Sequence, residues 1–200
     1  MIAYPDKWRS YDGLVVERGA HLANGARADA FELARALRKV GKPVDRAEWQ
    51  MTPSTVNAYY EPTMNQMVFP AGILQPPYYS PDRTHASNLG GVGMVMGHEL
   101  THGFDDSGRQ FDAKGNLEDW WSPKVNDAFV KRAECVEKQY ATYTNLRDEY
   151  ARMMVTVNPH SPSHFRVIGP LSNTKAFATA FSCKEGDAMV RLAASRCEVW

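Results

Sequence analysis

His98, Glu99 and His102 form an HExxH motif, which carries the clearest chemistry in the chain. Residues i and i+4 of a helix lie one turn apart on the same face, so both imidazoles can bind a single metal ion. A carboxylate at Glu99 can take a proton from a zinc-bound water and later give it to a leaving amine. The motif therefore predicts one Zn²⁺ and peptide-bond hydrolysis. The alternative is a surface helix with two solvated histidines.

The two histidines are an incomplete ligand set, because a catalytic zinc usually has three protein ligands and one position for water. Asp105 follows the motif closely enough to accept the second ring N–H of His102, as carboxylates near zinc-binding histidines commonly do. A helix end followed by a solvated turn explains this stretch equally well. The sequence thus predicts a zinc site whose third ligand lies elsewhere.

His160 and Arg166 lie in a segment of about residues 158–170 that contains a His-Ser-Pro loop and leads into a predicted strand. Their side chains could hold a substrate carbonyl oxygen or carboxylate. On local sequence alone, exposed loop residues are the favoured interpretation.

Composition limits the possible classes of protein. The chain has 200 residues, with 23 Lys and Arg against 23 Asp and Glu, so a net charge of zero gives no electrostatic case for nucleic acid. A hydrophobic content of 44% and an aromatic content of 11% are typical of a folded protein, and we expect one domain over residues 1–200. No apolar run reaches the roughly 18 residues of a membrane span, and residues 1–8 lack the pattern of a secretory signal.

The three cysteines, Cys135, Cys183 and Cys197, form an odd set. One sulfur could have lost a disulfide partner, or all three could be buried thiols in a reducing compartment. Their spacing does not separate these alternatives.

Hydrophobic periodicity predicts a mainly helical chain with a small β-hairpin, an α+β fold. An amphipathic helix is expected over 26–40, and two β-branched and aromatic runs at 55–60 and 66–70 indicate a hairpin, although a helix there is also possible. The HExxH helix should cover about 88–104, with Val92, Val95, Met96 and Leu100 toward a core. Four glycines, at 90, 91, 93 and 97, suggest close packing of that helix on another element.

Two further helices are expected near the C-terminus. Ser122 is a candidate N-cap for a helix from Pro123 to about Tyr143, with proline at the first helical position. A short helix is expected from Asn173 to Phe181.

Several stretches together resemble the C-terminal catalytic part of the neprilysin and endothelin-converting-enzyme family of zinc metallopeptidases. They cover most of the chain and follow the family's order. The matching stretches are 56–60, 65–77, 97–106, 119–121, 160–162 with 165–169, and 197–200.

The resemblance implies a thermolysin-like catalytic domain, here incomplete, in which His98 and His102 bind zinc. It implies that Glu99 is the general base and that Asp105 is the carboxylate that supports a zinc-binding histidine. It also suggests a disulfide between Cys135 and Cys197, with Cys183 paired to an N-terminal segment that this sequence lacks.

For substrate binding, the resemblance implies that Asn57 and Ala58 lie on an edge strand that pairs with the backbone of an extended peptide. His160 would stabilise the oxyanion, and Arg166 would bind a substrate carbonyl or shape a pocket. Peptides are therefore the expected partners.

The chain departs from the family where the third ligand should be. The family takes that ligand from the glutamate of a helical ExxxD motif, and the sequence skips this segment between residues 143 and 147. Glu134, Glu137 and Glu149 remain nearby, but none has aspartate four residues later. Glu198 stands where the family usually has arginine, and the family's N-terminal lobe is also missing.

Two functions follow from these observations. The first is a zinc-dependent metalloendopeptidase with Glu99 as general base. The second is a truncated, catalytically impaired relative that acts at most as a peptide-binding or assembly module. By resemblance the location would be extracellular or on a membrane ectodomain, although this sequence shows no signal or anchor.

Overall fold

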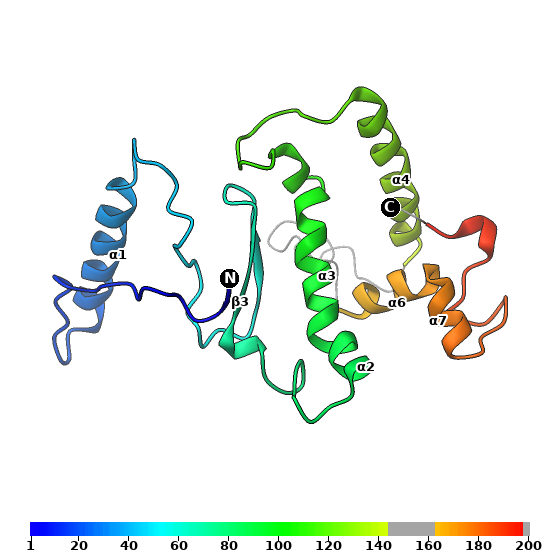
Figure 1. Cartoon of the computed structure of the whole chain (residues 1–200), viewed down its shortest axis with the longest axis horizontal. Helices are drawn as coiled ribbons and strands as arrows, with labels where there is room; N and C mark the ends of the chain where they lie inside the picture. The colour runs from blue at the N-terminus through cyan, green and yellow to red at the C-terminus, as the bar shows by residue number, and fades with distance from the viewer. Residues whose placement is uncertain (144–162, 198–200) are drawn as a thin grey trace. The chain divides into compact units, whose positions relative to one another are not determined.

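The computed structural model describes residues 1–143 and 163–197, which divide into two compact units, Met1–Trp120 and Trp121–Trp200 (Figure 1). Helices dominate and one small sheet is present, as the sequence predicted. Organisation as one domain over residues 1–200 stays a prediction. Within the described ranges, no helix is long and apolar enough to cross a membrane.

The sheet of the first unit has three strands in the order β1-β3-β2. Strand β2 (Tyr59–Glu61) pairs antiparallel with β3 (Gln66–Pro70), which confirms the predicted hairpin, and β1 (Ile2–Ala3) pairs parallel with β3. The prediction that the hairpin's first strand starts at residue 55 is wrong. The chain before Tyr59 forms backbone hydrogen bonds outside the hairpin: the carbonyl of Pro53 accepts the N–H of Gly72 at 2.8 Å.

A run of helical turns carries the HExxH motif. It consists of α2 (His85–Asn88), a π-helical turn (Leu89–Gly93), α3 (Met94–Thr101) and a 3-10 turn (His102–Phe104). The predicted helix over about 88–104 is therefore confirmed, with an earlier start. The side chain of Thr84 caps that start by accepting the N–H of Ser87 at 3.2 Å.

The core of the first unit lies between the sheet and α3. Ala58, Phe69, Ile73 and Val95 are its buried members. The prediction that Met96 and Leu100 face a core is wrong, since they are 49% and 54% exposed. Helix α3 packs on the sheet along the side that carries Val95, so its opposite side is exposed to solvent.

The glycines of this helical run have different roles. A Cβ on Gly91 would lie 2.1 Å from the carbonyl oxygen of Tyr78, which accepts the N–H of Val92 at 2.9 Å. A Cβ on Gly97 would meet nothing within 4 Å. The predicted close packing is therefore confirmed at Gly91 and wrong at Gly97.

Helix α1 (His21–Leu37) has no buried residue. It starts and ends earlier than the predicted 26–40. Ion pairs hold this helix in place. Arg35 on the helix and Lys39 just after it both bind the carboxylate of Glu48, and the Nζ of Lys39 lies 2.6 Å from Oε2 of Glu48. Charge pairing, more than apolar burial, joins α1 to the chain before the hairpin.

The second unit contains α4 (Pro123–Ala141), α6 (Ser163–Asn173) and α7 (Lys175–Ala180). The side chain of Ser122 accepts the N–H of Val125 at 3.4 Å, so the predicted cap is confirmed. Further 3-10 turns lie at Ala71–Ile73 and Gly108–Gln110 in the first unit and at Ala193–Ser195 in the second.

Two sequence predictions for the second unit are wrong. Residues 163–170 belong to helix α6, not to a loop and strand, and Asn173 ends α6 instead of starting a helix that reaches Phe181. Local sequence predicted a loop that leads into a strand. However, Phe165 and Gly169, one helical turn apart, contact Tyr140: its hydroxyl donates to the Phe165 carbonyl at 3.0 Å, and a Cβ on Gly169 would lie 2.5 Å from that hydroxyl.

A buried polar network and a disulfide join the helices of this unit. Gln139 is 2% exposed and bonds to Tyr143, to the Gly169 carbonyl and to Asn173. The side chain of Asn173 in turn accepts the N–H of Cys197 at 2.9 Å. Cys197 forms a disulfide with Cys135, which confirms the pairing implied by the resemblance.

We predict opposite effects for alanine at two glycines of the same helical run. Gly91→Ala should destabilise the protein by about 1–3 kcal/mol, because the methyl group would overlap a backbone carbonyl that cannot move cheaply. Gly97→Ala should be neutral or stabilise by up to about 1 kcal/mol, because alanine favours helix and the space is open. Urea unfolding measures both; equal effects would contradict the packing described here.

A second prediction concerns the effect of low pH on the ion pairs that hold helix α1. Partial burial by itself raises the pKa of Glu48, but hydrogen bonds from Lys39 and Arg35 outweigh it and hold the pKa below the ordinary 4.5. The ion pairs of Glu48 therefore stabilise the fold above about pH 4.5. This contribution is lost as the pH falls through the lower pKa that Glu48 has in the folded state.

Hydrogen exchange of α1 amides tests this pairing. At pH 7, Glu48→Gln should speed exchange relative to the parent chain, and the difference should shrink below pH 4.5 as the parent carboxylate becomes protonated. Asp29→Asn removes a charge from an exposed position of α1 and serves as the control. Equal exchange in both variants at pH 7 would rule out the proposed anchor.

Candidate metal centre

The imidazoles of His98 and His102 converge at the C-terminal end of α3. Their Nε2 atoms are 3.1 Å apart, with the rings edge to face. Two nitrogens that each lie 2.0–2.1 Å from a tetrahedral zinc are separated by about 3.3 Å. The pair therefore fits two adjacent positions of one zinc ion. Without a metal, the same separation lets one Nε2–H donate to the other nitrogen.

Asp105 fixes the orientation of His102. Its Oδ2 lies 2.7 Å from Nδ1 of His102, and an ionised carboxylate only accepts, so Nδ1 carries the hydrogen and Nε2 keeps its lone pair for a metal. The other oxygen, Oδ1, accepts the N–H groups of Ser107 at 3.0 Å and Gly108 at 2.7 Å. The contact expected from the sequence is thus present. Its role at a metal stays a prediction.

Glu99 lies on the buried side of α3, at 4% exposure. Its burial raises the pKa of the carboxyl, while the charge of His102 and the backbone N–H of Tyr60, which donates to it, act in the opposite direction. The carboxyl group therefore lies between helix α3 and strand β2. A raised pKa brings a carboxylate base closer to neutral pH, where it can both accept and return a proton.

No third ligand accompanies the histidine pair among the residues that the structure describes. In those residues, no group of three or more His, Cys, Asp or Glu side chains is placed to hold a metal ion. Glu134 and Glu137 are exposed on α4, and Glu134 pairs with Lys138 at 3.3 Å. Glu149 lies outside the described residues.

The predicted substrate-binding residues are divided between the two units. Asn57 is exposed and Ala58 is buried, and both directly precede the edge strand β2 instead of lying within it. Arg166 is exposed on α6. His160 and Glu198 lie outside the described residues. The roles that the resemblance implies for these side chains stay predictions.

Sequence reasoning missed Tyr60. Its backbone N–H lowers the pKa of Glu99, its hydroxyl donates to Asn65 at 2.9 Å, and its ring lies against Gly103 just after His102. The pattern showed only an aromatic residue in a strand. Which carboxylate the strand would meet depends on the packing of α3 on the hairpin, which local sequence does not reveal.

Known proteins match this chain over its full length. The sequence model of Peptidase family M13 matches residues 57–149 and 144–199. An endothelin-converting enzyme homolog of Locusta migratoria is 35% identical over 270 residues, and neprilysin-3 of Drosophila melanogaster is 33% identical over 271, each covering 100% of this chain. The crystal structure of the zinc metalloprotease ZMP1 of Mycobacterium tuberculosis matches 100% of the chain with a TM-score of 0.90 and 34% identity.

The chain belongs to peptidase family M13. The resemblance to the neprilysin and endothelin-converting enzymes is thereby confirmed, as is the expected incomplete catalytic fold.

The chain covers 37% of the locust M13 relative, 34% of the fly relative and 40% of the mycobacterial structure. The alignment with the locust protein spans 270 residues while this chain supplies 200, so about 70 positions have no counterpart here. The family match divides into two pieces that meet at residues 144–149. At this same point, between residues 143 and 147, the sequence is predicted to skip the ExxxD segment.

We predict that Asp105→Asn lowers zinc affinity by about 10–100-fold, because an amide cannot hold the His102 tautomer as a carboxylate does. Competition with a chromophoric chelator measures the affinity. Asp106→Asn, an exposed neighbour with the same charge change, is the matched control and should bind zinc like the parent. An equal loss in both variants would point to a general charge effect.

Proposed function

We propose that this chain is a zinc-dependent metalloendopeptidase catalytic part that hydrolyses peptide bonds with Glu99 as general base. The observation that carries the proposal is the convergence of two imidazole nitrogens, 3.1 Å apart, beside a buried carboxyl group. Membership of a peptidase family supports the reaction class. Because the chain spans little more than a third of its relatives, the activity of a whole relative is itself part of the proposal.

His98 and His102 would hold the zinc ion through Nε2, with Asp105 keeping the ring of His102 in place. Zinc bound there supplies a Lewis acid that lowers the pKa of water and polarises a carbonyl oxygen. Glu99 would take the proton from the attacking water and return it to the leaving nitrogen. Its position between α3 and β2 would limit the movement of the carboxylate between these two tasks.

The substrate would lie along the edge of the sheet. Strand β2 is an edge strand in the described sheet, and Asn57 and Ala58 extend its line toward the N-terminus. Their backbone groups would pair with an extended peptide. By resemblance, His160 would stabilise the oxyanion and Arg166 would bind a substrate carbonyl. Peptides are the proposed substrates, and an extracellular or ectodomain location stays a prediction.

A second candidate function has its own support. Among the described residues no third ligand is placed at the histidine pair, and about 70 positions of the locust relative have no counterpart. A site with two protein ligands binds zinc weakly and leaves it poorly oriented. In this case the chain is a catalytically impaired member that binds peptides or assembles with another chain.

One experiment separates the two functions. The purified chain and Glu99→Gln are compared for zinc content and for hydrolysis of an internally quenched fluorescent peptide. Under the peptidase proposal both bind zinc, and the variant loses hydrolysis by a factor of about 10²–10⁴, because glutamine cannot accept the proton.

The other outcomes are equally informative. Hydrolysis that persists in Glu99→Gln would exclude Glu99 as the base. Zinc below stoichiometry in both proteins, with no hydrolysis and unchanged peptide binding, would favour the impaired member. Parallel circular dichroism spectra establish that the variant is folded.

A further inference from the structure

The chain that follows the histidine motif, residues 103–113, is supported at both ends by the β2–β3 hairpin. At its start, the ring of Tyr60 lies against Gly103, where a Cβ would be 3.2 Å from the tyrosine hydroxyl oxygen. At its far end, Nδ2 of Asn65 donates to the carbonyl of Ala113 at 3.1 Å. Two side chains of one hairpin therefore contact both ends of the segment that carries the carboxylate partner of the second histidine.

A hydrogen bond links these two supports to each other. The hydroxyl of Tyr60 donates to Oδ1 of Asn65 at 2.9 Å, while Nδ2 of the same amide donates to Ala113. An amide that accepts on one side and donates on the other has its orientation set by two partners. Tyr60 and Asn65 therefore act as one connected pair.

The backbone of the hairpin turn keeps Asn65 in place. Asn65 has a φ of 47°, in the left-handed region that asparagine tolerates better than most residues. Beside it, Gly115 packs so closely that a Cβ would lie 1.9 Å from the carbonyl oxygen of Thr63. The turn and the loop around Ala113 are thus in direct backbone contact, which favours the bond from Asn65.

The other support reaches the backbone of the second histidine. Gly103 and His102 share a peptide group, and Gly108 packs on that group so closely that a Cβ would overlap the His102 carbonyl oxygen. The N–H of Gly108 donates to Oδ1 of Asp105 at 2.7 Å, and Oδ2 of Asp105 lies 2.7 Å from Nδ1 of His102. A shift of Gly103 away from the Tyr60 ring would therefore change the contact between Asp105 and His102.

We propose that Tyr60 and Asn65 are positioning residues for the metal centre, which act through Asp105 to keep the ring hydrogen of His102 on Nδ1 and its Nε2 available to a metal. This inference rests on the proposed function, in which His102 binds zinc. The role is indirect, so the effect should appear in His102 before any metal is added. A purely structural role would lower stability and leave His102 unchanged in the folded chain.

NMR of isotope-labelled histidine in the metal-free full chain tests the proposal, at a mildly alkaline pH where free imidazole is neutral. Tyr60→Phe removes the hydroxyl and keeps the ring. Asn65→Gly removes both amide bonds and keeps a residue that readily adopts a positive φ. Each variant should speed exchange of the His102 Nδ1–H with water by about threefold to tenfold, the range expected for the loss of one hydrogen bond.

Zinc affinity, measured by competition with a chromophoric chelator, provides a second readout. Each variant should bind zinc about threefold to tenfold more weakly than the parent chain. In an Asp105→Asn background the same substitutions should have no further effect, because residues that act through Asp105 do not add to its loss. Fully additive losses would overturn the proposal.

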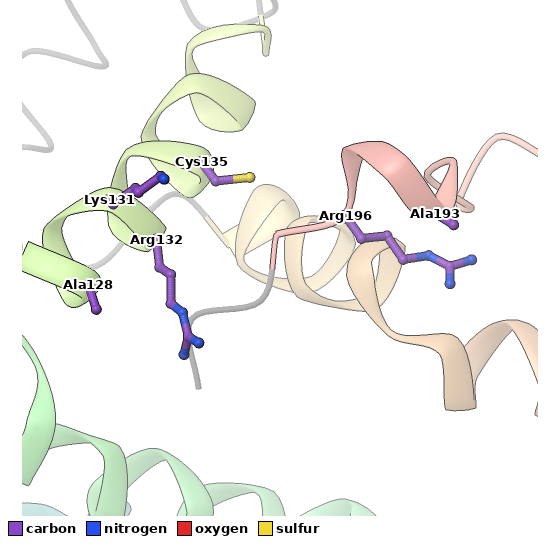
Figure 2. A pocket seen from close by; sticks show the side chains of 6 residues that line it. All are labelled: Ala128, Lys131, Arg132, Cys135, Ala193 and Arg196. Carbon is purple, nitrogen blue, oxygen red and sulfur yellow. The ribbon is translucent and has the colours of Figure 1, made fainter. Parts of the chain in front are cut away.

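Two controls separate this effect from a general one. Tyr59→Phe removes a hydroxyl from the preceding residue of the same strand, where it accepts the N–H of Gln50 at 2.8 Å. Ala128→Gly weakens helix α4 in the second unit, where Ala128 is exposed in the lining of a cavity of about 510 Å³ (Figure 2). Both should leave His102 exchange and zinc affinity unchanged, and an equal change in either control would overturn the proposal.

The outcome is separable from that of the peptidase proposal. If the parent chain binds no zinc or hydrolyses no peptide, the proposed function fails, while NMR of the metal-free chain still tests the role of Tyr60 and Asn65. A Tyr60→Phe chain that is folded by circular dichroism and exchanges the His102 Nδ1–H at the parent rate overturns the inference. Because this variant lacks only one hydroxyl, it serves even where Asn65→Gly does not fold.

Discussion

The packing of α3 on the hairpin determines the geometry of the candidate metal centre. Val95 and Glu99 lie one helical turn apart on the buried side of α3, at 9% and 4% exposure. Rotation of the helix about its axis would expose Val95 to solvent and remove it from the core with Ala58, Phe69 and Ile73, so this burial limits the rotation. Rotation fixed at Glu99 also fixes its neighbour His98, and His102 one turn further on.

The second unit relies on a different kind of interaction. Its centre contains Gln139, whose amide bonds a tyrosine on one side and the end of α6 on the other, and α6 reaches Cys197 through Asn173. Buried polar networks of this kind stabilise only when every member is satisfied, so they favour one arrangement of the helices. The disulfide of Cys197 then ties that arrangement to α4.

Local patterns predicted the helices and the hairpin because their signals are short in range: the cap at Ser122 and the i, i+4 spacing of the histidines. They failed where tertiary contacts decide. The residues of α6 were predicted to be a loop that leads into a strand, but they form a helix that contacts Tyr140. The motif predicted two ligands and a base, whereas Tyr60, whose backbone N–H lowers the pKa of Glu99, comes from a strand about 40 residues earlier, which local sequence does not reveal.

The candidate metal centre is compact along the chain, so few elements determine its geometry. His98, Glu99, His102 and Asp105 lie within eight consecutive residues, and their mutual geometry requires only α3, the turn after it and the hairpin. The third ligand of a zinc peptidase comes from a distant segment, so it can be lost without disturbing these four. Intact geometry at the motif is therefore evidence for ancestry, and catalysis depends in addition on a ligand from outside these eight residues.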